Sequence, residues 1–296
     1  MTYKKERGMG MELKIPENFF VGAAMSGPQT EGAYKTGGRL ESIWDTWSDL
    51  SISDFYNKVG SYVGNNFYEK YEDDIKLLKS LHMDSFRTSM QWSRLLTKDG
   101  KLNQEGAQFY HKVCKCAKEN QIELFMNLYH FDMPTYLFER GGWESRDVVE
   151  AYAAYARAAF REFGSEIRYW FTFNEPIVEP DQRYRNGFWY PFIKDAKRGM
   201  QVQYHLSLAH SLAVWEFRKA KEEGYVREDA TAMHFMNECV VYIPWTTPPL
   251  LSGYLATAGD WRAILVQALI LILGVLLYIP FVKINDVVMA KTMGEE

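Results

Sequence analysis

The first three quarters of the chain alternate short apolar runs with longer segments of helical periodicity. In residues 73–81, for example, Ile75, Leu78 and Leu81 recur at helical spacing beside lysines and aspartates. This pattern predicts helices over residues 66–81, 104–120, 147–163 and 195–223. The apolar runs between them predict strands over residues 19–25, 85–90, 123–130 and 169–175, with a weaker one over residues 230–237.

Strands separated by helices predict a parallel sheet, because a tight turn cannot join two parallel neighbours. The fold class is therefore α/β. An open doubly wound sheet and a (β/α)8 barrel both fit this alternation, and both place functional residues at the carboxyl ends of the strands. Polar residues do follow the predicted strands at those ends, so periodicity alone leaves the architecture open.

The pattern changes after Pro244. A proline-containing loop is followed by a stretch from Ala263 to Ile279 that is apolar apart from Gln267 and two tolerated residues. With its flanks it reaches about 20 residues, enough for a helix to cross a hydrocarbon core of roughly 30 Å. Residues 261–282 are therefore predicted to form a transmembrane helix, although a helix buried on every side in a soluble domain would look similar.

Composition narrows the classes of function. The formal net charge of -4, without a clustered basic face, argues against nucleic acid as a partner. Aromatic residues make up 16 % of the chain, which suits a carbohydrate, although core packing explains any single one equally well. The three cysteines, Cys114, Cys116 and Cys239, have neither disulfide-framework nor metal-ligand spacing and are interpreted as reduced. No metal and no cofactor is predicted.

The first 20 residues contain a basic stretch but no apolar signal core, so the part before the tail is expected in the cytoplasm. The apolar tail is expected to associate with the bacterial inner membrane. The predicted organisation is a barrel-like or doubly wound domain over residues 1–235, a junction with a proline-rich loop over 236–260, the span over 261–282 and a polar tail over 283–296.

Glu175 is the first candidate for catalysis. It lies in the run Tyr169-Trp-Phe-Thr-Phe-Asn-Glu-Pro176, at the end of a predicted strand, where its carboxyl would emerge among aromatic neighbours. Retaining glycoside hydrolysis needs a protonated acid and an ionised nucleophile about 5–5.5 Å apart, and an apolar surrounding keeps such an acid protonated. A glutamate after a strand, taken alone, is more often a helix cap or a surface acid.

Four motifs in order along the chain resemble those of glycoside hydrolase family 1. They are the segments Phe20–Gly32, Phe86–Arg94, Leu128–Pro134 and Thr172–Pro176. Within that family, residues 25–32 and 127–132 are most similar to bacterial 6-phospho-β-glucosidases. The resemblance implies a (β/α)8 barrel, of which this chain carries the first four to five β/α units, and a β-glucoside or 6-phospho-β-glucoside as substrate.

The same resemblance implies roles for individual residues. Glu175 would be the acid/base, and Gln29, His130 and Asn174 would hydrogen-bond sugar hydroxyls. Arg87 would support the nucleophile, because a nearby cation keeps a carboxylate ionised. Trp92 would be mainly structural, whereas Phe131 replaces a tryptophan found in many members and puts one sugar contact in doubt.

The family nucleophile lies in a Thr-Glu-Asn-Gly type motif that this sequence does not contain. Residues 243–262 and the apolar stretch after them resemble instead the end of the membrane component IIC of a cellobiose/lactose-type phosphotransferase system. The interpretation is a fusion of two parts of one sugar pathway, with a junction between residues 230 and 242 and a hydrolase half that is inactive alone. A membrane fragment of a permease and a non-catalytic sugar-binding module are the alternatives.

Overall fold

The computed structural model describes residue 16, residues 19–50 and residues 55–233, which lie in the first of two compact units. At the centre of this part is a five-stranded sheet in which all neighbouring strands are parallel. The strands are β1 (Gly22–Ala24), β2 (Ser85–Ser89), β3 (Glu123–Asn127), β4 (Tyr169–Phe171) and β5 (Thr231–Met233). Each predicted strand is present, and β1 to β4 are shorter than the apolar runs that predicted them, whereas the run that predicted β5 extends past the described residues.

The order of the strands separates the two architectures that periodicity left open. The strands lie in the sheet in the order in which they occur in the chain. A doubly wound sheet needs a point at which the strand order reverses, and the described sheet has none. Right-handed crossovers between strands in sequential order place their helices on one face, as in a barrel.

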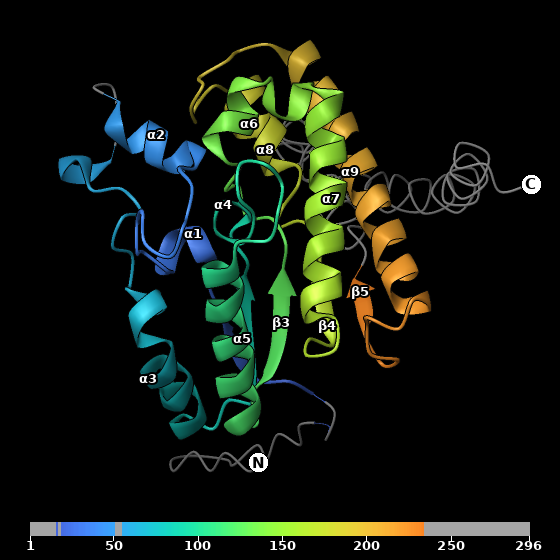
Figure 1. Cartoon of the computed structure of the whole chain (residues 1–296). Coiled ribbons are helices and arrows are strands. Elements are labelled where there is room, and N and C mark those ends of the chain that lie inside the picture. The colour runs from blue at the N-terminus through green and yellow to red at the C-terminus, as the bar shows by residue number, and fades with distance from the viewer. Residues whose placement is uncertain (1–15, 17–18, 51–54, 234–296) are drawn as a thin grey trace, which may run out of the picture. The chain divides into compact units, whose positions relative to one another are not determined.

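The helices cover this sheet and connect its strands (Figure 1). The four predicted helices are present as α3 (Phe67–Ser80), α5 (Gln104–Glu119), α7 (Arg146–Phe163) and α9 (Ala196–Glu222). Helix α9 begins after Asp195, whose carboxylate accepts hydrogen bonds from the backbone N–H groups of Lys197 and Arg198. Helix α7 packs beside α9, and α3 packs beside α5.

Several short helical turns were not predicted, because they are too short to show a period. They are α1 (Gly27–Thr30), α2 (Ile43–Asp49), η1 (Tyr56–Lys58), α4 (Trp92–Leu95), α6 (Thr135–Glu139), η2 (Gly142–Glu144), α8 (Val178–Pro180) and η3 (Asp181–Arg185). Most of them follow the carboxyl ends of β1 to β4, so they shape the loops at the end of the sheet where the candidate residues lie.

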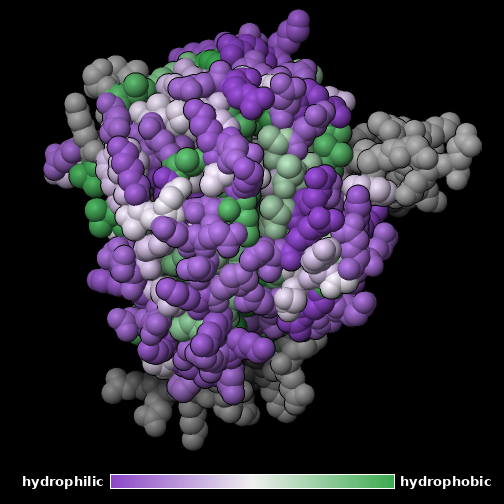
Figure 2. Space-filling model, in the orientation of Figure 1, coloured by the Kyte–Doolittle hydropathy of each residue, from purple (hydrophilic) through white to green (hydrophobic). Residues whose placement is uncertain are grey.

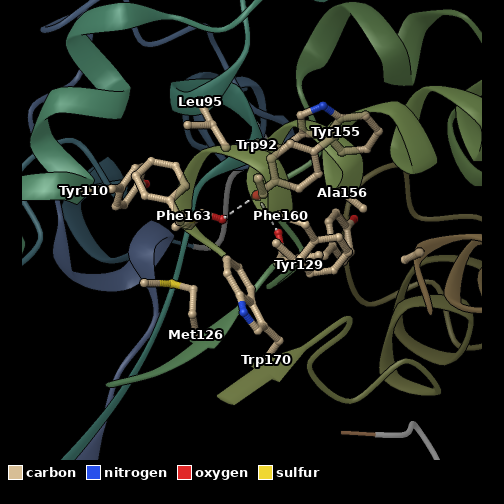
Figure 3. Close-up of a cluster of buried hydrophobic side chains, with 14 of the residues drawn as sticks. Trp92, Leu95, Tyr110, Met126, Tyr129, Tyr155, Ala156, Phe160, Phe163 and Trp170 are labelled. Carbon is tan, nitrogen blue, oxygen red and sulfur yellow. Dashed lines mark hydrogen bonds between the residues drawn. The ribbon is translucent and has the colours of Figure 1, made fainter. Parts of the chain in front are cut away.

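The main core lies between the sheet and its helices (Figure 3). Met126 and Trp170 reach it from β3 and β4, and Phe160 packs on Trp170 with ring centroids 5.1 Å apart. Trp92 is 1 % exposed and stacks on Tyr155 at 5.2 Å, which fits the structural role predicted for it. The surface of the molecule in the view of Figure 2 is mainly hydrophilic, with small apolar areas between polar ones.

The predicted transmembrane helix over residues 261–282, the junction and Cys239 lie outside the described residues. Among the helices that the structure does describe, none is both long and apolar enough to cross a membrane. The other two cysteines, Cys114 and Cys116, are buried in α5 as free thiols, which confirms that they form no disulfide with each other.

Candidate active site

Backbone hydrogen bonds continue the sheet beyond its strands at the carboxyl end. Met90 N–H donates to the carbonyl of Asn127, and Asn174 N–H donates to the carbonyl of Tyr129, both across 2.9 Å. At the first strand pair, Met25 N–H donates to the carbonyl of Arg87. The loops after β1 to β4 are therefore held side by side, and these loops carry the predicted site residues.

Arg87 and Asn174 meet directly. Arg87 lies in β2 and donates from Nη2 to Oδ1 of Asn174, which follows β4, across 2.8 Å. The guanidinium also lies over the ring of Phe171, 5.2 Å from its centroid. Asn174 is 7 % exposed, so this bond fixes the orientation of a buried amide at the end of the sheet.

His130 lies next to this pair as a neutral, partly buried imidazole. Burial and then the positive charge of Arg87 lower the pKa of His130 to about 3. Its Nδ1 atom is buried and has no hydrogen-bond partner among the described residues, and the same holds for Oδ1 of Asn127 at the end of β3. Buried polar atoms are costly without partners, so this region suits a polar ligand that supplies them.

Glu175 follows Asn174 and is partly buried. Its φ of +39° lies in the left-handed region, which is uncommon for a residue with a side chain. Phe131, which follows His130, also has a positive φ, of 65°. Such conformations cluster at functional sites, and here they occur one residue after each of two candidate ligand contacts.

Gln29 stands apart from these four residues. It lies in α1, after β1, and its side chain is exposed, with Oε1 accepting a hydrogen bond from Oγ of Ser26 across 2.8 Å. The turn itself is tied to β2, because Gly27 N–H donates to Oγ of Ser89 across 2.8 Å. The predicted grouping thus forms directly for Arg87, His130 and Asn174, while Gln29 is present on an adjoining loop.

Asp132 is a site residue that sequence reasoning did not single out. Its buried carboxylate accepts hydrogen bonds from the backbone N–H groups of His130, at 3.0 Å, and Trp92, at 2.9 Å. It therefore joins the loop after β3 to the loop after β2 and holds the backbone of His130. Burial outweighs these bonds and raises the pKa of Asp132 to about 7.

A buried ion pair beside the site was also missed. Glu31 and Arg94, 2 % and 0 % exposed, are joined by a bond of 2.7 Å between Oε2 and Nε. The same carboxylate accepts from Nε2 of Gln91 and from the hydroxyl of Tyr110. Glu31 and Arg94 lie in two of the motifs quoted above, where each is a charged residue near the end of a mainly uncharged segment.

Among the residues that the structure describes, no cluster of three histidine, cysteine or acidic side chains could hold a metal ion. The chemistry available is therefore a partly buried carboxyl, a neutral imidazole, an oriented amide and a guanidinium at the ends of consecutive strands.

The family model for glycosyl hydrolase family 1 matches residues 11–236. The chain belongs to this family. Its family 1 segment is 40% identical over 216 residues to the 6-phospho-beta-glucosidase GmuD of Bacillus subtilis, covering 73% of this chain and 46% of that protein. It is 36% identical to beta-glucosidase A of Acetivibrio thermocellus, covering 73% of this chain and 48% of that protein.

Solved structures support the same assignment. The family 1 chain matches the β-glucosidase of Thermotoga maritima in complex with cyclophellitol with a TM-score of 0.69 and 30% identity, over 74% of this chain and 49% of that one. It matches the AHE enzyme of Alicyclobacillus herbarius with a TM-score of 0.68 and 32% identity, over 72% and 47%. The described domain is thus a TIM-barrel-like α/β fold, and the chain spans about half the length of the relatives it matches.

Proposed function

We propose that the described domain supplies the acid/base half of a retaining β-glycosidase site, with Glu175 as the acid/base. The observation that supports this most is the meeting of Arg87, His130 and Asn174, of which Asn174 directly precedes Glu175 in the chain, on three consecutive strands and the loops after them. A barrel enzyme carries its chemistry at that end. His130 and Asn174 would hydrogen-bond the sugar, with Gln29 joining them when the exposed side chain turns inward.

For the substrate we propose a 6-phospho-β-glucoside such as cellobiose 6-phosphate, rather than a plain β-glucoside. Two observations support this choice. One is the resemblance to the 6-phospho-beta-glucosidase of Bacillus subtilis, which is 40% identical, against 36% for the beta-glucosidase of Acetivibrio thermocellus. The other is the resemblance of residues 243–262 to a phosphotransferase permease, since such a permease delivers phosphorylated sugars.

This polypeptide is proposed not to turn over substrate on its own. Retention needs a second carboxylate about 5–5.5 Å from the first, and the sequence lacks the family's nucleophile motif. Arg87, which would support that nucleophile, bonds Asn174 in the described domain. The purified chain should therefore release no nitrophenol from nitrophenyl 6-phospho-β-glucoside. Release that is abolished by Glu175→Gln would contradict the proposed inactivity.

Calorimetry separates a preserved sugar site from a lost one. Heat on titration with cellobiose 6-phosphate that disappears in Asn174→Ala would support the site. Asn120→Ala is the matched control, because Asn120 follows α5 and bonds only the carbonyl and thiol of Cys116 in its own helix. Binding without turnover would also fit a non-catalytic sugar-binding module. Adding a polypeptide that carries the family's nucleophile half separates the two, because turnover should be restored only if this chain is the acid/base half of an enzyme.

We propose separately, on the sequence alone, that residues 261–282 attach the chain to a membrane and derive from a phosphotransferase permease. The support is the length and apolar composition of that stretch and the resemblance of the segment before it. Membranes washed with carbonate should retain the chain. A chain found entirely in the wash would exclude this attachment, and reading the gene across codons 230–242 would test the fusion.

A further inference from the structure

The two faces of the sheet differ in burial along one register row, although Ser89 and Asn127 are fully buried at the carboxyl end of the less covered face. On the face toward the helices, Thr88, Met126 and Trp170 are 0–3 % exposed, and Ala232, the next residue of that row, is half-buried. On the opposite face, the row formed by Ala24, Arg87, Phe125, Tyr169 and Thr231 contains no buried member. A parallel sheet is normally buried on both faces, so the second face of the described sheet is incompletely covered.

This second face is aromatic at its centre. Phe125 and Tyr169 stack with ring centroids 4.5 Å apart and planes inclined by 6°. Phe20, which is 40 % exposed, packs edge-on against both rings at 5.3 and 5.8 Å. We call Phe20, Phe125 and Tyr169 the inner aromatic cluster. An ordered, partly exposed aromatic cluster is the kind of surface that forms the centre of a protein interface.

The edges of the sheet are also unfinished. Among the described residues, β1 pairs only with β2, and β5 pairs only with β4. Each edge strand therefore presents a row of backbone donors and acceptors that another strand could take. A barrel has no edges, because its last strand pairs with its first. Additional strands of the same sheet would cover the inner aromatic cluster and pair with both edge strands.

We propose that this face docks a separate polypeptide that carries the remaining strands of a family 1 barrel. The solved family 1 chain matches this domain over 49% of its own length at a TM-score of 0.69, so about half of such a chain lies outside the match and would have the size of the partner. A second copy fits less well, because two five-stranded sheets would bring ten strands to a barrel of eight.

The test uses the full 296-residue chain, tagged and co-expressed with the part of the Bacillus subtilis 6-phospho-beta-glucosidase that lies outside its segment aligned with this chain. We expect the two to co-purify as a soluble complex of one copy of each. Amides of β1 and β5 should exchange more slowly with solvent in the complex than in the chain alone, because new ladder bonds protect them. A lack of soluble complex overturns the proposal.

Two substitutions locate the interface. Phe20→Glu should weaken the complex at least about tenfold, because it places a charge at the centre of a buried face. Leu77→Glu is the matched control, since Leu77 is 57 % exposed on α3, and it should change the affinity less than about twofold. Equal effects of the two would overturn the assigned surface. The hydrogen-exchange measurement uses the unmodified chain, so it tests the interface even if Phe20→Glu misfolds.

Other occupants give other results, and each contradicts the proposal. A chain that is already a dimer of itself and excludes the fragment shows that a second copy covers the face. A monomer whose β1 and β5 amides are already protected, and that excludes the fragment, shows that the chain covers its own edges. The interface rests on family membership alone, whereas turnover by the complex rests on the proposed function. A complex that forms without turnover therefore contradicts the proposed function but not the proposed interface.

Discussion

Arg87 Nη2 donates to Asn174 Oδ1 across 2.8 Å and so ties the second strand to the loop after the fourth. The two residues lie 87 positions apart in the sequence, and the bond skips the intervening strand β3. Its consequence is electrostatic as well as structural, because it fixes a positive charge beside the partly buried ring of His130. The protonation state of His130 therefore reports on this arrangement without any need for activity.

We expect His130 to stay neutral from about pH 5 to pH 8. Burial first, and then the charge of Arg87, lower the pKa of His130 to about 3. Its ring-proton resonances should not shift over that range in an NMR titration. Arg87→Met removes the charge together with the hydrogen bond to Asn174, so the pKa of His130 should rise but remain below the ordinary value near 6.5. A His130 resonance that titrates near pH 6.5 in the unmodified chain would contradict the arrangement.

Asp132→Asn should flatten the pH dependence of stability. The pKa of Asp132 is raised from 3.8 to about 7, chiefly by burial. Between these values the folded state keeps a proton that the unfolded state releases, so the free energy of unfolding falls as the pH rises through this window. The loss across the window is on the order of a few kcal/mol. Denaturant unfolding at about pH 4.5, 5.5 and 7 measures it.

The asparagine variant lacks this titration. The difference in the free energy of unfolding between the unmodified chain and the variant should therefore shrink as the pH rises. At the acid end the variant should be less stable by about 1–3 kcal/mol, because its amide can accept only one of the two backbone N–H bonds from His130 and Trp92. A constant difference between the two proteins at all three pH values would show that Asp132 does not hold its proton in this window.

The elements of the fold were predictable because they depend on local pattern. The apolar spacing over residues 66–81 located α3, and the run after Gln121 located β3. The position of the site at the carboxyl ends of the strands followed from the geometry of parallel sheets. The choice of a barrel did not follow from the pattern, because it depends on the order in which distant strands pair.

The contacts inside the site were not predictable, because they join residues far apart in the sequence. Arg94 bonds Glu31 across 63 positions, and nothing local to either residue indicates the partner. The neutral state of His130 depends on burial by other segments. The left-handed backbone conformation of Glu175 was not predictable for a different reason. A positive φ is usually inferred from a glycine or an asparagine, and this position is a glutamate.

Glu31→Gln should destabilise the domain strongly, by about 3–5 kcal/mol, because it leaves the buried guanidinium of Arg94 without a countercharge. Equilibrium unfolding in urea measures the change. Lys76→Ala is the control, because its ion pair with Glu72 is 58 % exposed at both ends and should contribute less than about 1 kcal/mol. The double variant Glu31→Gln/Arg94→Met should recover part of the loss. A double variant worse than Glu31→Gln alone would show that packing, not charge, dominates.

His111 provides a pH-dependent link between α5 and α7, on the outer side of the domain. Its Nε2 lies 2.9 Å from Oε1 of Glu162, and its Nδ1 lies 2.5 Å from Oε1 of Glu166. Partial burial works to lower the pKa of His111, but the hydrogen bond to Glu162 and the charge and hydrogen bond of Glu166 outweigh it and raise the pKa above 6.5. The imidazolium is therefore the form that both carboxylates favour.

The sign of the effect on stability follows from this raised pKa. The stabilisation by His111 is fully present below the unfolded pKa near 6.5 and is lost as the pH rises through the higher folded value. His111→Gln should therefore cost more at about pH 6 than at pH 9, by less than about 1 kcal/mol, because the ring is 36 % exposed and solvent screens the pair. Thermal unfolding at both pH values measures this difference. In a Glu162→Gln/Glu166→Gln background the difference should vanish, and its persistence there would mean that another group titrates.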